Sequence, residues 1–365
     1  MNKYRVGIVG ATGMVGQRFI LLLQDHPWFT ITALAASAAS SGKPYEEAVA
    51  GRWAFEKPIP AAVAGMTVMD ASQIDAVAAK VDFVFCAINL KKDETRALEE
   101  AYAKHEVPVV SNNSACRGLN DVPMVIPEIN ASHIDVIPTQ RLRLGTHRGF
   151  IAVKPNCSIQ SYVPALTPLL DFKPQKLSVC TYQAISGASK TFATWPEMVD
   201  NVIPYIGGED EKSENEPLKI WGHLENTDAG PVIVNAKEPV ISAQCLRVAC
   251  SDGHMAAVSV SFAEKPTEEE ILHRWRNYET EAQRLGLPSA PKPFLQYFED
   301  PSRPQTRLDR DFERGFGISI GRLRTDAIFD YRFVCLSHNT IRGAAGGAVL
   351  TAELLCTKGW ITPRE

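Results

Sequence analysis

The sequence predicts an α/β protein of two domains: an N-terminal domain with a Rossmann-like parallel sheet and an α+β domain with a mostly antiparallel sheet. The chain has 365 residues, of which 45% are hydrophobic and 22% charged, so it can bury two cores. Residues 4–113 alternate short β-branched runs with helical patterns, as βαβ units do. Beyond residue 157, long runs alternate polar and apolar residues with period two, which is typical of antiparallel strands with one buried face.

The elements of the first domain follow one another as strand, helix and strand. Y-R-V-G-I-V is the first strand, M-V-G-Q-R-F-I-L-L-L the first helix and F-T-I-T-A-L-A-A the second strand. V-D-F-V-F-C-A-I and V-P-V-V supply later strands on either side of the helical K-K-D-E-T-R-A-L-E-E-A-Y. Strands separated by helices usually pair in parallel, so these segments predict a doubly wound sheet.

The rest of the chain supplies the second domain. Its alternating runs lie at 176–186, 239–249, 254–262 and 316–338, with helices between them. The segment I-R-G-A-A-G-G-A-V-L-T-A-E-L-L is a small-residue helix suited to close packing, and we expect it to return to the first domain. Residues 287–315 hold five prolines, which predicts a long structureless loop that is functional or makes subunit contacts.

Composition and charge exclude several classes of protein. Lys and Arg number 38 against 42 Asp and Glu, and no dense basic run is present, so nucleic acid is not expected as a partner. The N-terminal apolar run is too short for a signal peptide, and no stretch approaches the roughly 20 apolar residues of a membrane span, which predicts a cytoplasmic protein. The eight cysteines form no C-x-x-C pair, so we expect neither a disulfide framework nor a metal site.

A glycine-rich segment, G-A-T-G-M-V-G, lies between the first strand and the first helix. Glycines at this junction let the backbone turn tightly and approach a pyrophosphate, and the helix N-terminus adds free N–H donors. The alternative is a turn that serves packing alone. The context favours a dinucleotide site, with these residues as the expected contacts: Gly10, Thr12, Gly13, Met14, Val15 and Gly16.

The end of the second strand indicates which dinucleotide is bound. NAD enzymes usually place Asp or Glu there to bind the ribose hydroxyls, whereas this chain reads A-A-S-A-A-S-S-G-K. Ser37, Ser40, Ser41 and Lys43 offer hydroxyl donors and a positive charge, as a 2′-phosphate requires, so NADP is favoured over NAD. A flexible solvated loop without this role is the alternative.

Cys157 is the candidate nucleophile. It lies in K-P-N-C-S, where Asn156 or Cys157 can cap a helix that begins near Ser158, and a thiol at a helix N-terminus has its thiolate stabilised. A lone cysteine is more often a packing residue, and we interpret four others in apolar segments that way: Cys86, Cys180, Cys335 and Cys356.

His254 is the candidate proton shuttle. If Asp252-Gly253 forms a two-residue hairpin turn, Ser251 faces His254, and Arg247 lies on the same sheet face. That face would combine an acid/base group with an anion-binding cation. A histidine that serves only structure remains the alternative.

Together these motifs resemble those of the aspartate-β-semialdehyde dehydrogenase family, and its archaeal and fungal branch in particular, over nearly the whole chain. Pro155 to Ser158 match the family's P-N-C-[ST] motif, and Arg247 to His254 match R-V-x-x-x-x-G-H. The resemblance implies NADPH-dependent reductive dephosphorylation of L-4-aspartyl phosphate to aspartate 4-semialdehyde through a thioacyl enzyme. That reaction belongs to lysine, threonine and methionine biosynthesis and leads to diaminopimelate.

The resemblance also implies roles for single residues. Cys157 would attack the acyl phosphate, His254 would act as general acid and base, and Gln183, in T-Y-Q-A-I-S-G-A, would orient the thioacyl group. Arg247 would bind the substrate α-carboxylate. The remaining implied contacts are Glu216 with the amino group, Arg117, Lys219 and nearby Asn113 with phosphate, and Ser186, Gly187 and Asn339 with the cofactor.

Two other functions compete with this one. A malonyl-CoA reductase-like enzyme would share the glycine loop, the cysteine and the histidine, but Asn156 and the intact E-P-L-K segment favour the aspartyl substrate. A non-catalytic NADP-binding module is disfavoured by the intact pair of Cys157 and His254. We expect residues 1–156, joined by the C-terminal 339–365, to bind NADP, residues 157–338 to carry catalysis and dimerisation, and the protein to be a homodimer or homotetramer.

Overall fold

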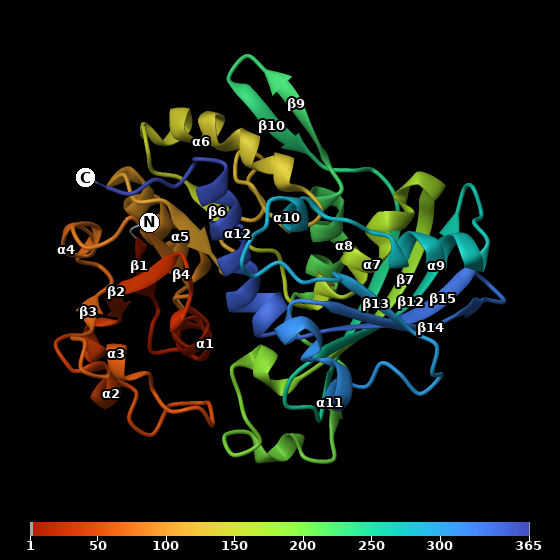
Figure 1. Ribbon diagram of the computed structural model, residues 1–365, viewed down its shortest axis with the longest axis horizontal. Helices are drawn as coiled ribbons and strands as arrows, with labels where there is room; N and C mark the ends of the chain where they lie inside the picture. The colour runs from red at the N-terminus through yellow and green to blue at the C-terminus, as the bar shows by residue number, and fades with distance from the viewer. Residues whose placement is uncertain (1–2, 365) are drawn as a thin grey trace.

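The computed structural model describes residues 3–364, so the outermost residues of the expected domain limits lie outside the described range. Figure 1 shows two sheets side by side, the first built from the N-terminal part of the chain and the second from its later part. The strands of the first sheet pair in parallel in the order β3-β2-β1-β4-β5-β6, which reverses direction between β1 and β4 as in dinucleotide-binding folds. They are β1 (Tyr4–Val9), β2 (Phe29–Ala36), β3 (Met69–Asp70), β4 (Phe83–Cys86), β5 (Val109–Ser111) and β6 (Ile151–Val153).

Helices cover both faces of the first sheet, because its central strands are apolar on both sides. Side chains of α1 (Met14–Leu23) and the C-terminal α12 (Gly346–Thr357) pack on one face, and those of α4 (Ile74–Ala78) and α5 (Lys92–Lys104) on the other. The predicted doubly wound parallel sheet is confirmed. The other helical segments of this part are η1 (Ala38–Ser40), α2 (Tyr45–Ala48), α3 (Ala61–Ala64), η2 (Ala131–Val136) and α6 (Ile137–Leu144).

The second sheet is mixed, with the order β13-β14-β15-β12-β7-β11-β8. Four of its neighbouring pairs are antiparallel, while β7·β11 and β13·β14 are parallel, so the predicted mostly antiparallel sheet is confirmed. Its strands are β7 (Pro174–Gln183), β8 (Val202–Ile203), β11 (Val240–Val248), β12 (His254–Phe262), β13 (Leu295–Phe298), β14 (Ile318–Thr325) and β15 (Tyr331–Ser337). A separate hairpin is formed by β9 (His223–Thr227) and β10 (Gly230–Val234).

Helices pack against one face of the second sheet. Apolar side chains of α7 (Tyr162–Leu166) and α9 (Glu268–Arg276) join the inward residues of β7, β12 and β15 in one core, whereas Tyr182 on the other face is 38% exposed. The other helical segments are η3 (Ser158–Gln160), η4 (Thr167–Phe172), η5 (Ile185–Ala188), η6 (Pro196–Met198), α8 (Glu209–Ile220), α10 (Glu281–Arg284), α11 (Thr306–Asp309), η7 (Phe312–Gly315) and η8 (Ile341–Ala345).

Two local predictions were wrong. β11 and β12 do not form a hairpin around Asp252-Gly253, because β7 lies between them and pairs with both. Residues 287–315 are not structureless, since they contain β13, which extends the second sheet by pairing with β14, and α11. The five prolines lie outside β13, before and after it, so they do not interrupt its ladder.

Candidate active site

Cys157 lies just beyond β6, at the start of the short turn η3. The predicted helix begins there only as a three-residue 3₁₀ turn before α7, too short to give the thiolate the stabilisation that we expected. Cys157 is the N-cap residue of this turn, and the preceding Asn156 fixes the turn, since its Oδ1 accepts the N–H of Ser158 at 2.7 Å. Burial raises the pKa of the Cys157 thiol, Glu209 raises it further, and nearby cations oppose both effects.

His254, the first residue of β12, lies against the thiol. Its Nε2 is 3.5 Å from Sγ of Cys157, and its Nδ1 accepts the backbone N–H of Ala184 at 3.0 Å. A backbone N–H can only donate, so the proton of the neutral ring must be on Nε2, facing the sulfur. Burial, and then the charge of Arg247, lower the pKa of His254 well below its usual value, so the ring is neutral at neutral pH.

Arg247 reaches the same place although β7 separates its strand from that of His254. Its Nη1 donates to the carbonyl of Ala184 at 2.7 Å, so the residue that follows β7 contacts both His254 and Arg247. Gly187 lies against both side chains, and a Cβ there would be 2.7 Å from Nη1 of Arg247 and 3.0 Å from the His254 ring. Arg247 and His254 therefore meet as the sequence predicts, through the end of β7 instead of a hairpin.

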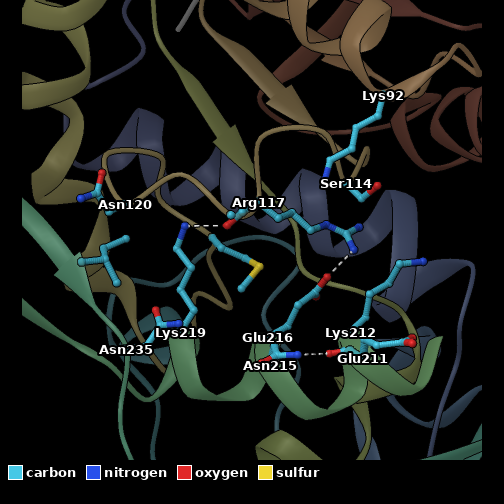
Figure 2. Close-up of a pocket in the computed structure, with 13 residues that line it drawn as sticks. Lys92, Ser114, Arg117, Asn120, Glu211, Lys212, Asn215, Glu216, Lys219 and Asn235 are labelled. Atoms are coloured by element: carbon cyan, nitrogen blue, oxygen red, sulfur yellow. Dashed lines mark hydrogen bonds and ion pairs between the residues drawn. The ribbon is translucent and has the colours of Figure 1, made fainter. Parts of the chain in front are cut away.

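Arg117 and Glu216 form a buried ion pair beside the nucleophile. Nη1 of Arg117 lies 2.8 Å from Oε1 of Glu216, whose Oε2 accepts the N–H of Asn156 at 2.6 Å. Both side chains line a cavity of about 350 Å³ that Lys92 and Lys212 also border (Figure 2). This cavity combines several cations with the carboxylates of Glu211 and Glu216, as a zwitterionic phosphorylated ligand requires.

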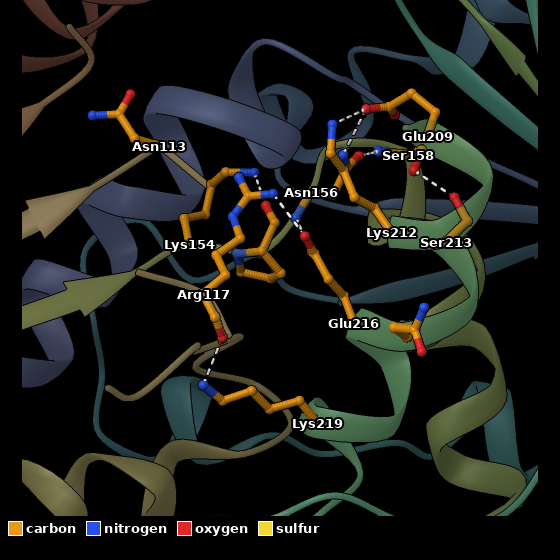
Figure 3. A network of polar contacts seen from close by, with 12 residues as sticks. Asn113, Arg117, Lys154, Asn156, Ser158, Glu209, Lys212, Ser213, Glu216 and Lys219 are labelled. Carbon is orange, nitrogen blue, oxygen red and sulfur yellow. Dashed lines mark hydrogen bonds and ion pairs between the residues drawn. The ribbon is translucent and has the colours of Figure 1, made fainter. Parts of the chain in front are cut away.

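Lys219 and Asn113, which the sequence predicts as phosphate contacts, instead donate hydrogen bonds to groups of the protein. Lys219 donates to the carbonyls of Arg117, Leu119 and Val122 at 2.7, 2.5 and 2.9 Å, so its three ammonium hydrogens have partners. Burial lowers the pKa of Lys219 to about 8. The amide of Asn113 donates to Glu99 at 2.9 Å and points away from Arg117 in Figure 3. In this arrangement Lys219 fixes the loop that carries Arg117, and Asn113 stabilises the first domain.

Sequence reasoning missed several polar residues around the site. The amide of Asn112 has no partner for either polar atom within residues 3–364, although both atoms are buried. Lys154 is buried, donates to the carbonyls of Pro155 and Gly343, and lowers the pKa of the Cys157 thiol. Glu209 accepts from Asn156, Gln183 and Lys212. One signal was available, because Glu209 and Lys212 repeat the E-x-x-K spacing of Glu216 and Lys219.

The glycine loop has the close contacts that only glycine permits. Gly10 has φ of +91°, and a Cβ on it would lie 2.5 Å from the carbonyl oxygen of Ala87. A Cβ on Gly16 would lie 2.2 Å from the oxygen of Gly10. Gly13 directly precedes α1, which starts with Met14 and Val15. The turn therefore brings the N-terminus of α1 against the ends of β1 and β4, a geometry that fits a pyrophosphate.

A cavity of about 340 Å³ opens beside the glycine loop and is lined by Gly10, Thr12, Gly13, Ser37 and Asp70, among others. Asp70, at the end of β3, is a carboxylate that the sequence reasoning did not place there. Of the four residues predicted to bind the 2′-phosphate, only Ser37 lines this cavity. Ser40 is buried, Ser41 is partly exposed and Lys43 is exposed at the surface.

Asn339, which the sequence predicts as a cofactor contact, links three segments of the chain. Its Oδ1 accepts the N–H of Gly253 at 2.8 Å, and its Nδ2 donates to Oγ of Ser186 at 2.8 Å. The predicted cofactor contacts Asn339, Ser186 and Gly187 thus lie together with His254.

No helix within residues 3–364 combines the length and apolar character that crossing a bilayer requires. Within the same limits, no three His, Cys, Asp or Glu side chains gather in a way that could hold a metal ion.

Three buried histidines predict acid-sensitive stability. Burial lowers the pKa values of His133, His254 and His338, the last to about 4. The unfolded chain, with histidine pKa values near 6.5, therefore binds more protons at lower pH than the folded protein does. We expect the free energy of unfolding to fall by about 1.4 kcal/mol per pH unit for each such histidine below about pH 6.5. Urea unfolding at pH 8, 7, 6 and 5 measures this slope, and a constant unfolding midpoint down to pH 5 would contradict it.

Comparison with protein families identifies the class of the chain. Residues 5–137 match the family described as "Semialdehyde dehydrogenase, NAD binding domain", and residues 166–342 match "Semialdehyde dehydrogenase, dimerisation domain". These matches cover most of the chain and agree with the two sheets and the cysteine–histidine pair at their junction. By class, the protein is an oxidoreductase of the semialdehyde dehydrogenase type.

Individual relatives narrow the class. The chain is 42% identical to the aspartate-semialdehyde dehydrogenase of Aspergillus fumigatus, covering 98% of this chain and 99% of the relative. It is 40% identical to that of Archaeoglobus fulgidus, with 97% and 98% covered. The crystal structure of the Candida albicans enzyme with NADP matches with a TM-score of 0.88 at 39% identity, covering 99% of this chain and all of that one. The chain belongs to the aspartate-semialdehyde dehydrogenase family, so the resemblance inferred from its motifs is confirmed.

Proposed function

We propose that this protein catalyses the NADPH-dependent conversion of L-4-aspartyl phosphate to aspartate 4-semialdehyde and phosphate. The observation that carries the proposal is the contact of 3.5 Å between Cys157 Sγ and His254 Nε2, with Arg247 held at the same place through Ala184. The relatives named aspartate-semialdehyde dehydrogenase support this substrate over a coenzyme A thioester.

In the proposed reaction, the thiolate of Cys157 attacks the acyl carbon, and the C–O bond to phosphate breaks, which leaves a thioester. The departing phosphate takes up one proton from water and leaves as HPO₄²⁻. Arg117 binds the phosphate, and Lys219 holds the loop that carries Arg117. NADPH, when bound, supplies the hydride that reduces the thioester. The Nε2–H of His254 donates a hydrogen bond to the negative oxygen of the resulting tetrahedral species. Its collapse reforms the C=O bond, breaks the C–S bond and returns Cys157 as a thiolate.

The substrate's other charges define the rest of the site. Nη1 of Arg247 is used by Ala184, which leaves Nε and Nη2 as a planar pair of donors for the α-carboxylate. Glu216 supplies negative charge for the amino group. We assign the NADP-binding domain to residues 1–156 with 339–365 and the catalytic and dimerisation domain to 157–338. We further propose a cytoplasmic homodimer or homotetramer that associates through the uncovered face of the second sheet around Tyr182.

The assay that tests the function runs in the reverse direction. Aspartate semialdehyde with phosphate and NADP should yield NADPH, whereas malonate semialdehyde with coenzyme A should yield little. A preference for the second pair would favour the malonyl-CoA reductase-like alternative. NADPH binding with neither activity would favour a non-catalytic module.

Arg247→Lys is expected to raise the KM for aspartate semialdehyde by about tenfold or more, because lysine keeps the charge but cannot make two parallel hydrogen bonds to a carboxylate. Steady-state kinetics with each substrate varied in turn checks this. The KM for phosphate should change less. If the KM for phosphate rises more, the two anion sites are exchanged and the proposed substrate orientation is wrong.

Replacing Ser37 and Lys43 together with alanine is expected to raise the KM for NADPH by about tenfold while changing that for NADH much less, since only NADPH carries the 2′-phosphate. Initial rates with both cofactors measure the two ratios. Because Ser37 lines the cavity and Lys43 is at the surface, the single Ser37→Ala variant is the informative control. Equal effects on both cofactors would refute 2′-phosphate binding here.

A further inference from the structure

Lys154 is a buried cation, three residues before the nucleophile, that the proposed reaction does not use. It follows β6 directly, is only 3% exposed, and its backbone N–H donates to the carbonyl of Ser111 at 2.8 Å. Lysine is rarely buried to this extent unless its charge has a partner. Within residues 3–364, however, its ammonium donates to two carbonyl groups and to no carboxylate.

The two carbonyl groups belong to different parts of the chain. One is that of Pro155, in the turn that carries the nucleophile, and the other is that of Gly343, in η8. An ammonium group has three N–H donors, so one is left without a partner among the described residues. Figure 3 shows Lys154 next to Arg117, whose charge acts on it. The side chain therefore links the turn of Cys157 to η8 close to the proposed phosphate ligand.

The segment that accepts from Lys154 also packs against the nucleophile. A Cβ added to Gly343 would lie 2.8 Å from Cβ of Cys157 and 3.2 Å from its Cα. One turn later, a Cβ added to Gly347 would lie 3.3 Å from Cδ of Lys154 and 3.4 Å from its Cγ. Lys154 and Cys157 thus pack on the same stretch of backbone, and neither position next to them leaves room for a side chain.

Arg342 holds this segment in place. Its Nη1 and Nη2 donate to the two carboxylate oxygens of Glu128 at 2.5 and 2.7 Å, and both side chains are fully buried. Its Nε donates to Oε1 of Gln160, in η3, at 3.3 Å. A paired arginine in this planar geometry is a rigid attachment. The carbonyl of the next residue, Gly343, is therefore a fixed acceptor for Lys154.

The position of Lys154 has an electrostatic consequence for the nucleophile. Burial raises the pKa of the Cys157 thiol and Glu209 of α8 raises it further, whereas three cations lower it, and Lys154 lowers it most. The other groups that face the thiol are Arg117 after β5, Arg247 of β11 and the neutral ring of His254 of β12.

The three cations differ in what a bound substrate does to them. In the proposed reaction, the phosphate lies against Arg117 and the α-carboxylate against Arg247, so substrate anions offset both of these charges. Lys154 has no such anion assigned to it. Its charge is therefore the one that stays available to the sulfur when the substrate is bound.

The surroundings of Lys154 respond to the same substrate. Burial, and then the charge of Arg117, lower the pKa of Lys154 to about 7, the Cys157 thiolate and Glu216 of α8 raise it, and Arg342 of η8 lowers it. A phosphate bound to Arg117 offsets the second of these effects and so favours the ammonium form. The thiolate and the ammonium then stabilise each other.

We propose that Lys154 is a positioning residue for the nucleophile, which ties the turn of Cys157 to Gly343 of η8 and supplies positive charge to the thiolate while substrate anions occupy Arg117 and Arg247. This inference rests on the proposed function for the identity of the nucleophile and of the substrate anions. It gives a role to a buried charge that forms no ion pair with a carboxylate in the described residues.

The experiment compares three variants of Lys154 with wild type and with a control. Lys154→Met removes the charge and the donors but keeps the length of the side chain, Lys154→Gln removes the charge but keeps an amide donor, and Lys154→Arg keeps both. The control is Lys104→Met, because Lys104 is exposed at the end of α5. Unfolding curves verify that each variant folds, and either uncharged variant is sufficient for the comparison.

The first readout needs no substrate: the rate at which iodoacetamide alkylates Cys157, followed by peptide mass spectrometry from pH 6 to 10. The midpoint should move up by about one pH unit in Lys154→Met and Lys154→Gln, because the thiolate loses a nearby positive charge. In Lys154→Arg it should lie at or below the wild-type midpoint, since a guanidinium stays charged throughout this range. The control should match wild type. An unchanged or lower midpoint in the uncharged variants would overturn the proposal.

The second readout is kcat/KM for aspartate semialdehyde as a function of pH. At pH 7 we expect the uncharged variants to lose about tenfold relative to wild type, as a shift of one pH unit in thiol ionisation implies. The loss should shrink as the pH rises past the alkylation midpoint of each variant, and Lys154→Arg should recover most of the activity. A loss that stays constant past that midpoint would indicate a purely structural role and contradict the electrostatic one.

The two readouts separate this inference from the proposed function. If the wild type does not use aspartate semialdehyde, the proposed function fails. The alkylation profile still decides whether Lys154 acts on Cys157, because it depends on neither substrate nor cofactor.

Discussion

Cys157→Ser is expected to lower kcat by about 10³-fold or more while leaving the affinity for NADPH unchanged. Serine is nearly the same size, but its hydroxyl is far harder to ionise than a thiol. The adjacent His254 offers no free lone pair to activate that hydroxyl, because its Nδ1 is bonded to Ala184 and its Nε2 carries the proton. We expect cofactor binding to depend on the glycine loop at the ends of β1 and β4, which the substitution does not touch.

Steady-state rates and fluorescence titration with NADPH measure the two effects separately. Cys180→Ser is the matched control, because Cys180 is also partly exposed but lies within β7, and it should keep kcat within about twofold. A Cys157→Ser enzyme that retained a tenth of the wild-type kcat would exclude a covalent role for this residue.

The first sheet could be predicted because its pattern is local. Each β-branched run is followed by a helix, and parallel strands joined by helices have few possible arrangements. The pairing of β11 and β12 could not be predicted in this way. The turn residues Asp252 and Gly253 have the composition of a hairpin, but β7, more than fifty residues earlier, occupies the place between the strands. Sequence proximity and a suitable turn do not exclude insertion of a third strand.

The residues of the candidate site show the same difference between local patterns, which could be predicted, and contacts between distant segments, which could not. Cys157, Arg247 and His254 were found because each lies in a short motif with a chemical meaning, and the structure brings them together. Lys154 was missed because its importance depends on burial and on partners distant in sequence, whereas the E-x-x-K spacing of Glu209 and Lys212 was a local signal that was overlooked. Lys219 has the expected residue type in the expected segment, but three carbonyl groups bind its ammonium, and no local pattern reveals where those carbonyls point.

His254→Ala is expected to lower kcat by about 10²- to 10⁴-fold, the second large effect. The movement of negative charge through the two steps shows which function of the His254 ring the alanine variant loses. Hydride addition to the thioester creates a negative oxygen, and the collapse of that species returns the charge to sulfur, so neither step consumes a proton. What both steps need is a donor that stabilises charge as it moves between oxygen and sulfur, and the Nε2–H of His254 faces the sulfur at 3.5 Å.

His254→Gln separates this donor role from proton transfer, because the glutamine amide keeps an N–H but cannot act as an acid or base near neutral pH. We expect glutamine to recover about tenfold of the activity lost in alanine, as stabilisation of a negative oxygen by one donor allows. Single-turnover reduction of the acylated enzyme isolates the step. Because the pKa of His254 lies well below 6.5, the wild-type rate of this step should also show no titration of the ring between pH 6 and 8. Equal losses in the glutamine and alanine variants, together with a titration near pH 6.5, would instead assign His254 an obligatory proton transfer.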